Sequence, residues 1–170
     1  MFKVLKKIIS IGIVTETLEI DKNVELLGNK LKQQVNKRFA RSLAIRAVDS
    51  GSCNGCELEL HAINNAFYDA ERYGIHFVAS PRHADILLVT GCVSRHMEEA
   101  VFKAYTAMPH PKWVIALGNC AIDGGIFGSS YASLGGLQKL IQVDYQIAGC
   151  APTPLNILQG LLGFMEHLSE

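Results

Sequence analysis

Four of the five cysteines are spaced in a way that requires a folded scaffold. Cys53 and Cys56 form a Cys-Asn-Gly-Cys pair, whereas Cys120 lies in Gly-Asn-Cys and Cys150 in Gly-Cys-Ala-Pro. Four thiolates complete the ligand set of an iron–sulfur cluster or of a structural zinc ion. The pair needs only one tight loop, but the other two ligands come from distant parts of the sequence. A metal centre of this kind therefore requires a fold that brings three loops to one place.

The composition indicates one globular domain and argues against nucleic acid as a partner. The chain has 170 residues, 49% of them hydrophobic, which is enough for a single core. Its 16 basic and 16 acidic residues leave a net charge of zero, so no basic surplus is available for phosphate contacts. The early apolar run at residues 8–14 is too short to span a bilayer, and no small-x-small cleavage site follows it. We therefore expect a soluble, cytoplasmic chain.

Residues 1–40 differ in composition from the remainder and predict an N-terminal amphipathic arm. Within residues 26–39, which are rich in Lys, Gln and Asn, Leu27, Leu31 and Val35 recur at helical spacing. The basic residues of this segment are typical of the solvated face of a helix that docks on the domain or on a partner. Contact with lipid head groups is the alternative. Residues 41–170 then form the main domain.

Short apolar strands alternate with helices through the main domain. Strands are expected at residues 43–48, 75–79, 85–90 and 113–117 and within 140–148, and helices at residues 57–67, 96–108 and 154–168. Residues 124–136 are expected to form a glycine-rich loop. This alternation predicts an α/β fold with a doubly wound parallel sheet.

The four cysteines all follow predicted strands. In a parallel sheet the loops after the strands share one edge, which is where ligands bind. Cys53 and Cys56 follow the first strand, Cys120 follows the strand at 113–117, and Cys150 follows the last strand. We therefore expect these four thiols to converge. Cys92 also follows a strand, and we interpret it as a small buried thiol rather than a ligand.

The identity of the metal stays open on spacing alone. An odd number of irregularly spaced cysteines in a reducing compartment favours metal binding over a disulfide scaffold. Zinc sites usually use two short-spaced pairs, and this chain has one, so a 4Fe-4S cluster is favoured over zinc. A cluster with four thiolate ligands has no open coordination position. The chain is therefore expected to carry electrons and to have no catalytic residue of its own.

Four segments carry distinctive motifs. Residues 48–59 contain the Cys-Asn-Gly-Cys pair, residues 80–91 a Ser-Pro-Arg-His-Ala-Asp run before a strand, residues 118–125 Gly-Asn-Cys-Ala-Ile-Asp-Gly-Gly, and residues 149–152 Gly-Cys-Ala-Pro. Together these segments resemble the twenty-kilodalton subunit family of respiratory complex I and its relatives, the small subunits of membrane-associated NiFe hydrogenases. The resemblance covers residues 41–168 and includes both motif order and spacing.

The resemblance implies a flavodoxin-like fold in which Cys53, Cys56, Cys120 and Cys150 hold the single 4Fe-4S cluster next to a catalytic large subunit. In complex I members the first two ligands are adjacent, whereas here two residues intervene, as in hydrogenases of the formate-hydrogenlyase type. Glu59 matches a family glutamate with a proton-linked or interface role, and a plain helix-surface carboxylate is the alternative. Arg82 and His83 are candidates to face the large subunit.

The function expected from the resemblance is electron transfer within a membrane-associated hydrogenase-like oxidoreductase. The implied partners are a large subunit, either NiFe-hydrogenase-like or of the forty-nine-kilodalton complex I type, a ferredoxin-like iron–sulfur subunit and, indirectly, membrane subunits on the inner face of the cell membrane. The corresponding subunit of an NADH-quinone oxidoreductase, which passes electrons to quinone, is the first alternative. A structural or assembly protein, in which zinc or a cluster serves only stability, is the second.

Overall fold

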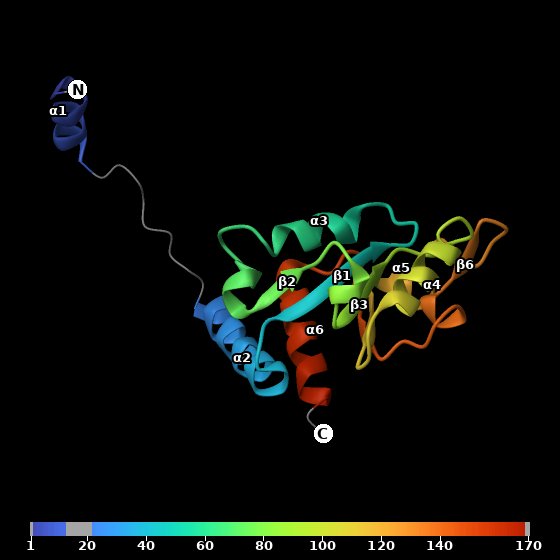
Figure 1. The fold of residues 1–170 in the computed structure, drawn as a ribbon. Coiled ribbons are helices and arrows are strands. Elements are labelled where there is room, and N and C mark those ends of the chain that lie inside the picture. Colours follow the sequence, from blue (N-terminus) through green and yellow to red (C-terminus); the bar gives the residue numbers. More distant parts are fainter. Residues whose placement is uncertain (1, 13–21, 169–170) are drawn as a thin grey trace.

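The computed structural model describes residues 2–12 and 22–168, and its centre is a five-stranded parallel sheet (Figure 1). The strand order is β2-β1-β3-β5-β7, the order of flavodoxin-like folds. The strands are β2 (Ile75–Phe77), β1 (Leu43–Asp49), β3 (Ile86–Thr90), β5 (Trp113–Leu117) and β7 (Tyr145–Ile147). The predicted doubly wound α/β fold is confirmed.

The central strand β3 is buried along its whole length and reads Ile-Leu-Leu-Val-Thr. A strand covered on both faces needs apolar side chains at successive positions rather than at alternate ones. Ile86 and Leu88 enter the core on one face of the sheet, and Leu87 and Val89 enter the core on the other. The sequence of β3 therefore requires that both faces of the sheet are covered.

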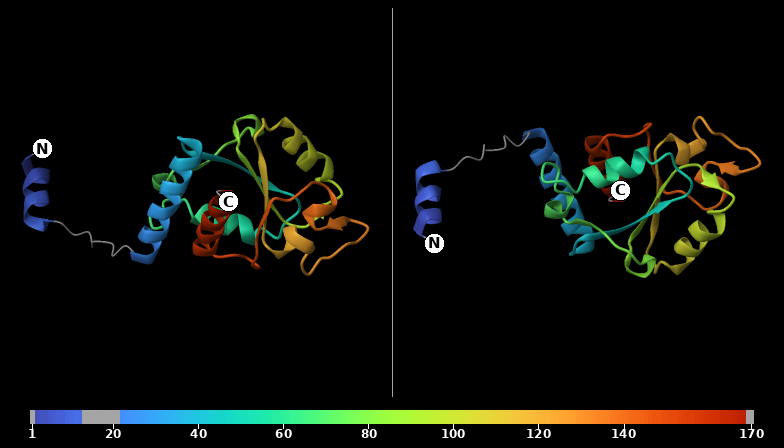
Figure 2. Two further views of the ribbon diagram at one scale, coloured as in Figure 1. Left: turned by 90° about the horizontal axis from the view of Figure 1, so that it is seen from below. Right: turned by 90° about the horizontal axis from the view of Figure 1, so that it is seen from above.

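Helices cover both faces of the sheet (Figure 2). One face packs against α2 (Lys22–Phe39), α3 (Gly55–Ala62) and α6 (Pro154–His167). The other face packs against α4 (Glu98–Ala107) and α5 (Asn119–Asp123). The loops that leave the carboxyl ends of the strands therefore emerge between two helical layers.

Helix α2 contributes buried residues to the core. Leu31 and Val35 are fully buried, and Gly28 lies directly against the ring of Tyr73, where a side chain would collide. Close packing against Tyr73 explains a glycine within a helix that is otherwise well suited to longer side chains. The arm predicted for residues 1–40 thus includes a helix docked on the domain. The division of the chain after residue 40 remains a prediction.

The N-terminal helix α1 (Phe2–Ile11) has a different environment, since each of its residues is exposed. Part of the apolar run at residues 8–14 lies outside the described residues. Across residues 2–12 and 22–168, none of the helices is both long and apolar enough to cross a membrane.

Several predicted boundaries change in the structure. The helix predicted at 57–67 ends at Ala62, because the Asn65 side chain accepts hydrogen bonds from the backbone amides of Phe67 (2.9 Å) and Tyr68 (3.0 Å) and forms a turn. The loop predicted at 124–136 contains β6 (Ser133–Gly135), which pairs antiparallel with β4 (Val93–Ser94). Neither strand is long enough to show a period in the sequence. The described part of the chain also contains three short 3-10 helices: η1 (Ala70–Tyr73), η2 (Pro81–His83) and η3 (Leu137–Lys139).

Candidate metal centre

The four candidate ligands lie beyond the carboxyl ends of three parallel strands. Cys53 and Cys56 follow β1, with Cys56 in the first turn of α3. Cys120 is in α5, directly after β5, and Cys150 follows β7. Neighbouring parallel strands end on the same side of a sheet, so topology alone gathers these thiols at one edge.

The loop after β1 is shaped by its own polar side chains. Asp49 Oδ1 accepts hydrogen bonds from the backbone amides of Gly51 and Ser52, both at 2.8 Å. Ser52 Oγ accepts from the amide of Asn54 at 3.1 Å and donates to Glu57 Oε2 at 2.7 Å. Because such local bonds fix a turn without a regular element, the two cysteines of the pair are held by a preformed loop.

This loop is also tied to the loop after β3. The buried Ser50 hydroxyl donates to the carbonyls of Thr90 (2.7 Å) and Gly91 (3.1 Å). Gly91 has a positive φ of 78°, and a Cβ there would come within 2.7 Å of the Gly51 carbonyl carbon. The prediction that Cys92 is a buried thiol is confirmed, and its Sγ donates to the Gly51 carbonyl at 3.4 Å. This bond links Cys92, in the loop after β3, to the loop after β1.

A second set of bonds joins the loops after β5 and β7. The amide of Gly118 donates to the carbonyl of Ile147 at 2.8 Å. The amide of Asn119 donates to the carbonyl of Gly149 at 2.9 Å, and Asn119 Oδ1 accepts from the Gly149 amide at 2.9 Å. Cys120 and Cys150, the next residues along each loop, are therefore held in a fixed relation to each other.

Gly118 brings the two sets of loops together. Its φ is 85°, a conformation that favours glycine, and a Cβ on it would lie 2.7 Å from Cys56 Sγ and 3.4 Å from the Gly149 carbonyl oxygen. The β5 loop therefore approaches the Cys56 thiol as closely as its backbone allows. A side chain at this position would occupy the space in front of the sulfur.

The thiols are close enough to influence one another electrostatically. Burial raises the pKa of the Cys56 thiol to about 11, and negative charge on Glu57, Cys120, Cys53 or Cys150 contributes to the rise. Burial likewise raises the pKa of the Cys120 thiol, with Cys150 the largest contributor among the neighbouring charges. Four thiolates at this edge would therefore need a compensating positive centre.

Comparison with known proteins assigns the chain to a family. Residues 53–164, more than half of the chain, match the family described as NADH ubiquinone oxidoreductase, 20 kDa subunit. The chain belongs to this family. The matched range includes all four candidate ligands and ends within α6.

Individual proteins of the hydrogenase type are also similar over most of this chain. Formate hydrogenlyase subunit 7 of Escherichia coli is 45% identical over 140 residues, which are 81% of this chain and 55% of that protein. This chain thus spans about half the length of that relative. A probable membrane-bound hydrogenase subunit of Pyrococcus furiosus is 41% identical over 152 residues, which are 85% of this chain and 91% of that protein.

Solved structures agree with the fold. A chain of an archaeal membrane-bound sulfane sulfur reductase superposes with a TM-score of 0.69 at 38% identity, over 78% of this chain and 73% of that one. A chain of an NAD+-reducing NiFe hydrogenase has a TM-score of 0.56 at 21% identity, over 72% of this chain and 92% of that one. The second likeness supports the fold alone.

The donor set of the candidate centre is compatible with a four-iron cluster. Four cysteine thiolates are the usual ligands of such a cluster, and each would bind its own iron. Among residues 2–12 and 22–168, no three His, Cys, Asp or Glu side chains gather as the ligands of one metal ion.

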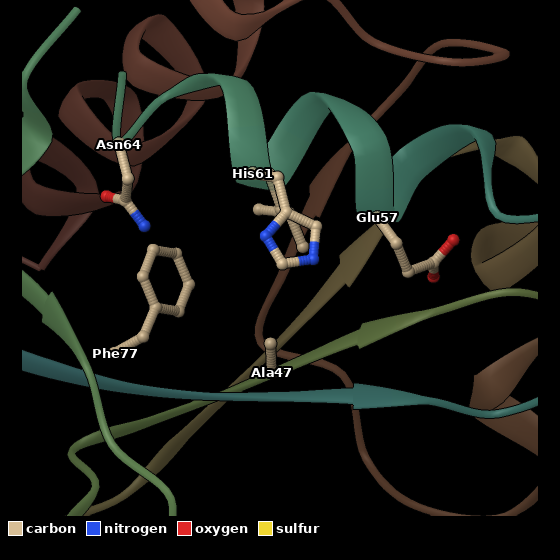
Figure 3. A pocket seen from close by; sticks show the side chains of 6 residues that line it. Ala47, Glu57, His61, Asn64 and Phe77 are labelled. Carbon is tan, nitrogen blue, oxygen red and sulfur yellow. The ribbon is translucent and has the colours of Figure 1, made fainter. Parts of the chain in front are cut away.

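A cavity of about 220 Å³ lies between α3 and the sheet, and Glu57, the residue after Cys56, is part of its lining (Figure 3). His61 projects from α3, and Asn64 from the turn that follows it, toward Ala47 on β1 and Phe77 on β2 (Figure 3). The lining residues are Ala47, Glu57, Leu60, His61, Asn64 and Phe77. The sequence pattern does not predict this cavity, because its two walls are far apart in the sequence.

Glu57 has one satisfied and one unsatisfied oxygen. Its Oε2 accepts from Ser52, whereas its buried Oε1 has no hydrogen-bond partner among the described residues. Glu59, the glutamate singled out by the resemblance, is half-buried on α3 and is not among the residues that line the cavity. Its proton-linked or interface role remains a prediction.

Arg82 and His83 lie in η2, which precedes β3. This places them toward the edge of the sheet opposite the cysteines, where both are exposed. The structure therefore does not bring them to the candidate centre. The interpretation that Arg82 and His83 face a large subunit remains a prediction.

Proposed function

We propose that this chain is the electron-transfer subunit of a membrane-associated, hydrogenase-like oxidoreductase, and that Cys53, Cys56, Cys120 and Cys150 hold one 4Fe-4S cluster. The observation that carries the proposal is the placement of these thiols beyond the carboxyl ends of β1, β5 and β7 of one parallel sheet, with the β5 and β7 loops joined by hydrogen bonds. Family membership and the names of the relatives are consistent with a subunit of an oxidoreductase complex.

The residues around the centre would position and protect such a group. Gly118 and Gly125 leave space beside Cys56 and Cys120, since a Cβ at either position would lie within 3.0 Å of the sulfur. Backbone amides at such glycine-rich loops can approach cluster sulfurs closely, which tunes the potential. When bound, a 4Fe-4S cluster accepts and donates single electrons. The raised thiol pKa values mean that loading must release protons from the protein.

Exposed apolar side chains beside the cysteines support a protein partner at this edge. Ile126 is 86% exposed and lines a surface hollow together with Cys120 and Cys150. Phe127 follows it, and Leu58 is exposed on α3, two residues after Cys56. Apolar residues gathered around a functional edge mark an interface. We propose that a catalytic large subunit, of the NiFe-hydrogenase or forty-nine-kilodalton complex I type, covers this edge and places its reaction centre within reach of the cluster.

The spacing of the first two ligands favours a hydrogenase-type complex over a quinone-reducing one. Two residues separate Cys53 and Cys56, as expected for hydrogenases of the formate-hydrogenlyase type. On this proposal a ferredoxin-like iron–sulfur subunit exchanges electrons with the chain, and the complex lies on the cytoplasmic side of the cell membrane. An NADH-quinone oxidoreductase type of complex is the second candidate, favoured by the description of the matched family.

Anaerobic isolation of the complex from its native source through an affinity tag on this chain tests the proposal. We expect a large subunit related to those of NiFe hydrogenases or of complex I to copurify, with roughly four irons and four acid-labile sulfides per copy of this chain. If the copurifying large subunit contains no nickel, the second candidate, an NADH-quinone oxidoreductase type of complex, would replace the hydrogenase type. Stoichiometric zinc without iron, or a chain recovered without a large subunit under gentle extraction, would contradict the proposal.

A further inference from the structure

Helix α1 separates its apolar and charged side chains completely. Successive residues of an α-helix are rotated by about 100°. On that wheel the apolar residues of Phe2–Ile11 fall in one half of the circumference, and the polar ones fall in the opposite half. The apolar residues are Phe2, Val4, Leu5, Ile8, Ile9 and Ile11, and the polar ones are Lys3, Lys6, Lys7 and Ser10.

The apolar half is uncovered by the described part of the chain. Phe2 is 87% exposed and Ile9 is 80% exposed, and the other four apolar side chains are exposed as well. This contrasts with α2, which buries Leu31 and Val35 against the sheet and α6. Six large apolar side chains on so short a helix are a strong reason to expect an apolar environment in the working protein.

The charged side chains of α1 indicate which kind of apolar environment covers its apolar half. Its three ionisable side chains are all lysines, and it contains no acidic residue. A short helix with a wide apolar face and a lysine-rich opposite face suits the boundary between acyl chains and anionic head groups. Lys6 and Lys7 flank the apolar half, where their long stems can reach head-group phosphates while the apolar side chains enter the bilayer.

We propose that α1 lies flat in the surface of an anionic lipid bilayer, with Phe2, Ile8 and Ile9 among the inserted side chains and the three lysines on head-group phosphates. The chain then contacts the membrane directly, in addition to any attachment through partner subunits. A partner-protein groove is the competing occupant. The inference does not depend on the metal centre, because α1 contains none of the candidate ligands.

Vesicle flotation of the full chain tests this proposal. We expect binding to vesicles of phosphatidylcholine mixed with phosphatidylglycerol, weak binding to phosphatidylcholine alone, and a loss of binding as salt is raised. Replacement of each lysine by Gln should weaken binding about fivefold. Hydrogen–deuterium exchange should show new protection within residues 2–12 when anionic vesicles are added.

The matched variant exchanges Lys3 and Ile8, as Lys3→Ile together with Ile8→Lys. It keeps composition and charge but places a lysine within the apolar half of the helix. We expect a loss of binding of about tenfold or more, because the apolar face is interrupted. A second control, Lys30→Gln on the exposed side of α2, should bind as the wild type does.

Three results would overturn the proposal. The first is absence of binding to anionic vesicles by the wild-type chain, and the second is equal binding by the exchanged variant. The third is protection of α1 amides by copurified partner subunits but not by vesicles, which would assign the apolar face to a protein groove. Each of these results leaves the iron and sulfide content unaffected, so it can be separated from a failure of the cluster proposal.

Discussion

The two edges of the parallel sheet differ in how completely their buried polar groups are hydrogen-bonded. At the amino edge, before β3, the buried Asp85 carboxylate is fully paired: it bonds the Arg41 guanidinium at 2.6 and 3.1 Å and the Ala44 amide at 3.0 Å. At the carboxyl edge, Glu57 Oε1 is buried without a hydrogen-bond partner among the described residues, and Cys53 and Cys150 are exposed. The polar group at the first edge is fully paired within the chain, whereas the one at the second edge is only partly paired.

This difference is consistent with the proposal that a cluster and a partner subunit bind at the carboxyl edge. Native proteins pair nearly all of their buried polar groups, and departures concentrate at functional sites. The loops at the carboxyl edge are nonetheless well ordered by internal hydrogen bonds, through Asp49, Ser50 and Asn119. A hydrogen-bond donor of a partner subunit would pair Glu57 Oε1, and the four thiols of the same edge would hold the proposed cluster.

The largest expected effect concerns the four proposed ligands. Replacement of Cys56 or Cys120 by Ser should abolish or severely reduce the iron and sulfide content of the isolated complex, since the cluster loses a thiolate. Replacement of Cys92 by Ser should retain the cluster, because its thiol only donates to the Gly51 carbonyl. Metal analysis and the visible absorption of anaerobic samples measure both. Retention of full iron in the Cys120 variant would exclude that residue as a ligand.

The second largest expected effect is a loss of folding stability when the Asp85 carboxylate at the amino edge is removed. Asp85→Ala should lower the free energy of unfolding by about 2–3 kcal/mol, because the buried Ala44 amide loses its acceptor. Denaturant titration measures the loss, and the folded fraction should still bind iron. The control Glu99→Ala removes an exposed pair with Lys103 and should leave stability unchanged within error. Loss of iron in a folded Asp85→Ala protein would show that the two edges are coupled.

Sequence reasoning anticipated the sheet and the shared edge of the cysteines well. Continuous apolar runs such as β3 and β5 have few alternatives, and parallel topology then determines which side their loops occupy. The β4–β6 pair could not be anticipated, since a two-residue strand such as Val93–Ser94 has no measurable period. The close approach of Gly118 to the Cys56 thiol could not be predicted either, because it depends on the position of Cys56 in space.

A third effect separates steric contact at the centre from backbone strain. Gly118→Ala should reduce iron content and cost about 1–3 kcal/mol, because its Cβ would meet Cys56 Sγ at 2.7 Å in a positive-φ conformation. Gly128 also has a positive φ, of 56°, but nothing lies within 4 Å of a Cβ there. Gly128→Ala should therefore show strain alone and keep its iron. Equal iron loss in both variants would remove the steric explanation.

The smallest effect is the pH dependence of the metal-free chain. The pKa of Cys56 is raised in the folded state to about 11, from 9.0, chiefly by burial. Between these values the unfolded chain releases a proton that the folded chain keeps, so stability should fall as the pH rises through that window. Solvent exposure of the thiol moderates the size of the loss. Cys56→Ser should flatten the profile, whereas an unchanged profile would argue against a protonated Cys56 thiol.

The most direct test of the carboxyl-edge centre is Mössbauer spectroscopy of the isolated complex after ⁵⁷Fe has been incorporated only into this chain. We expect the spectrum of one 4Fe-4S cluster, which is absent from the Cys120→Ser variant and present in the Cys92→Ser variant. Mononuclear iron, or a chain that contains zinc in place of iron, would contradict it.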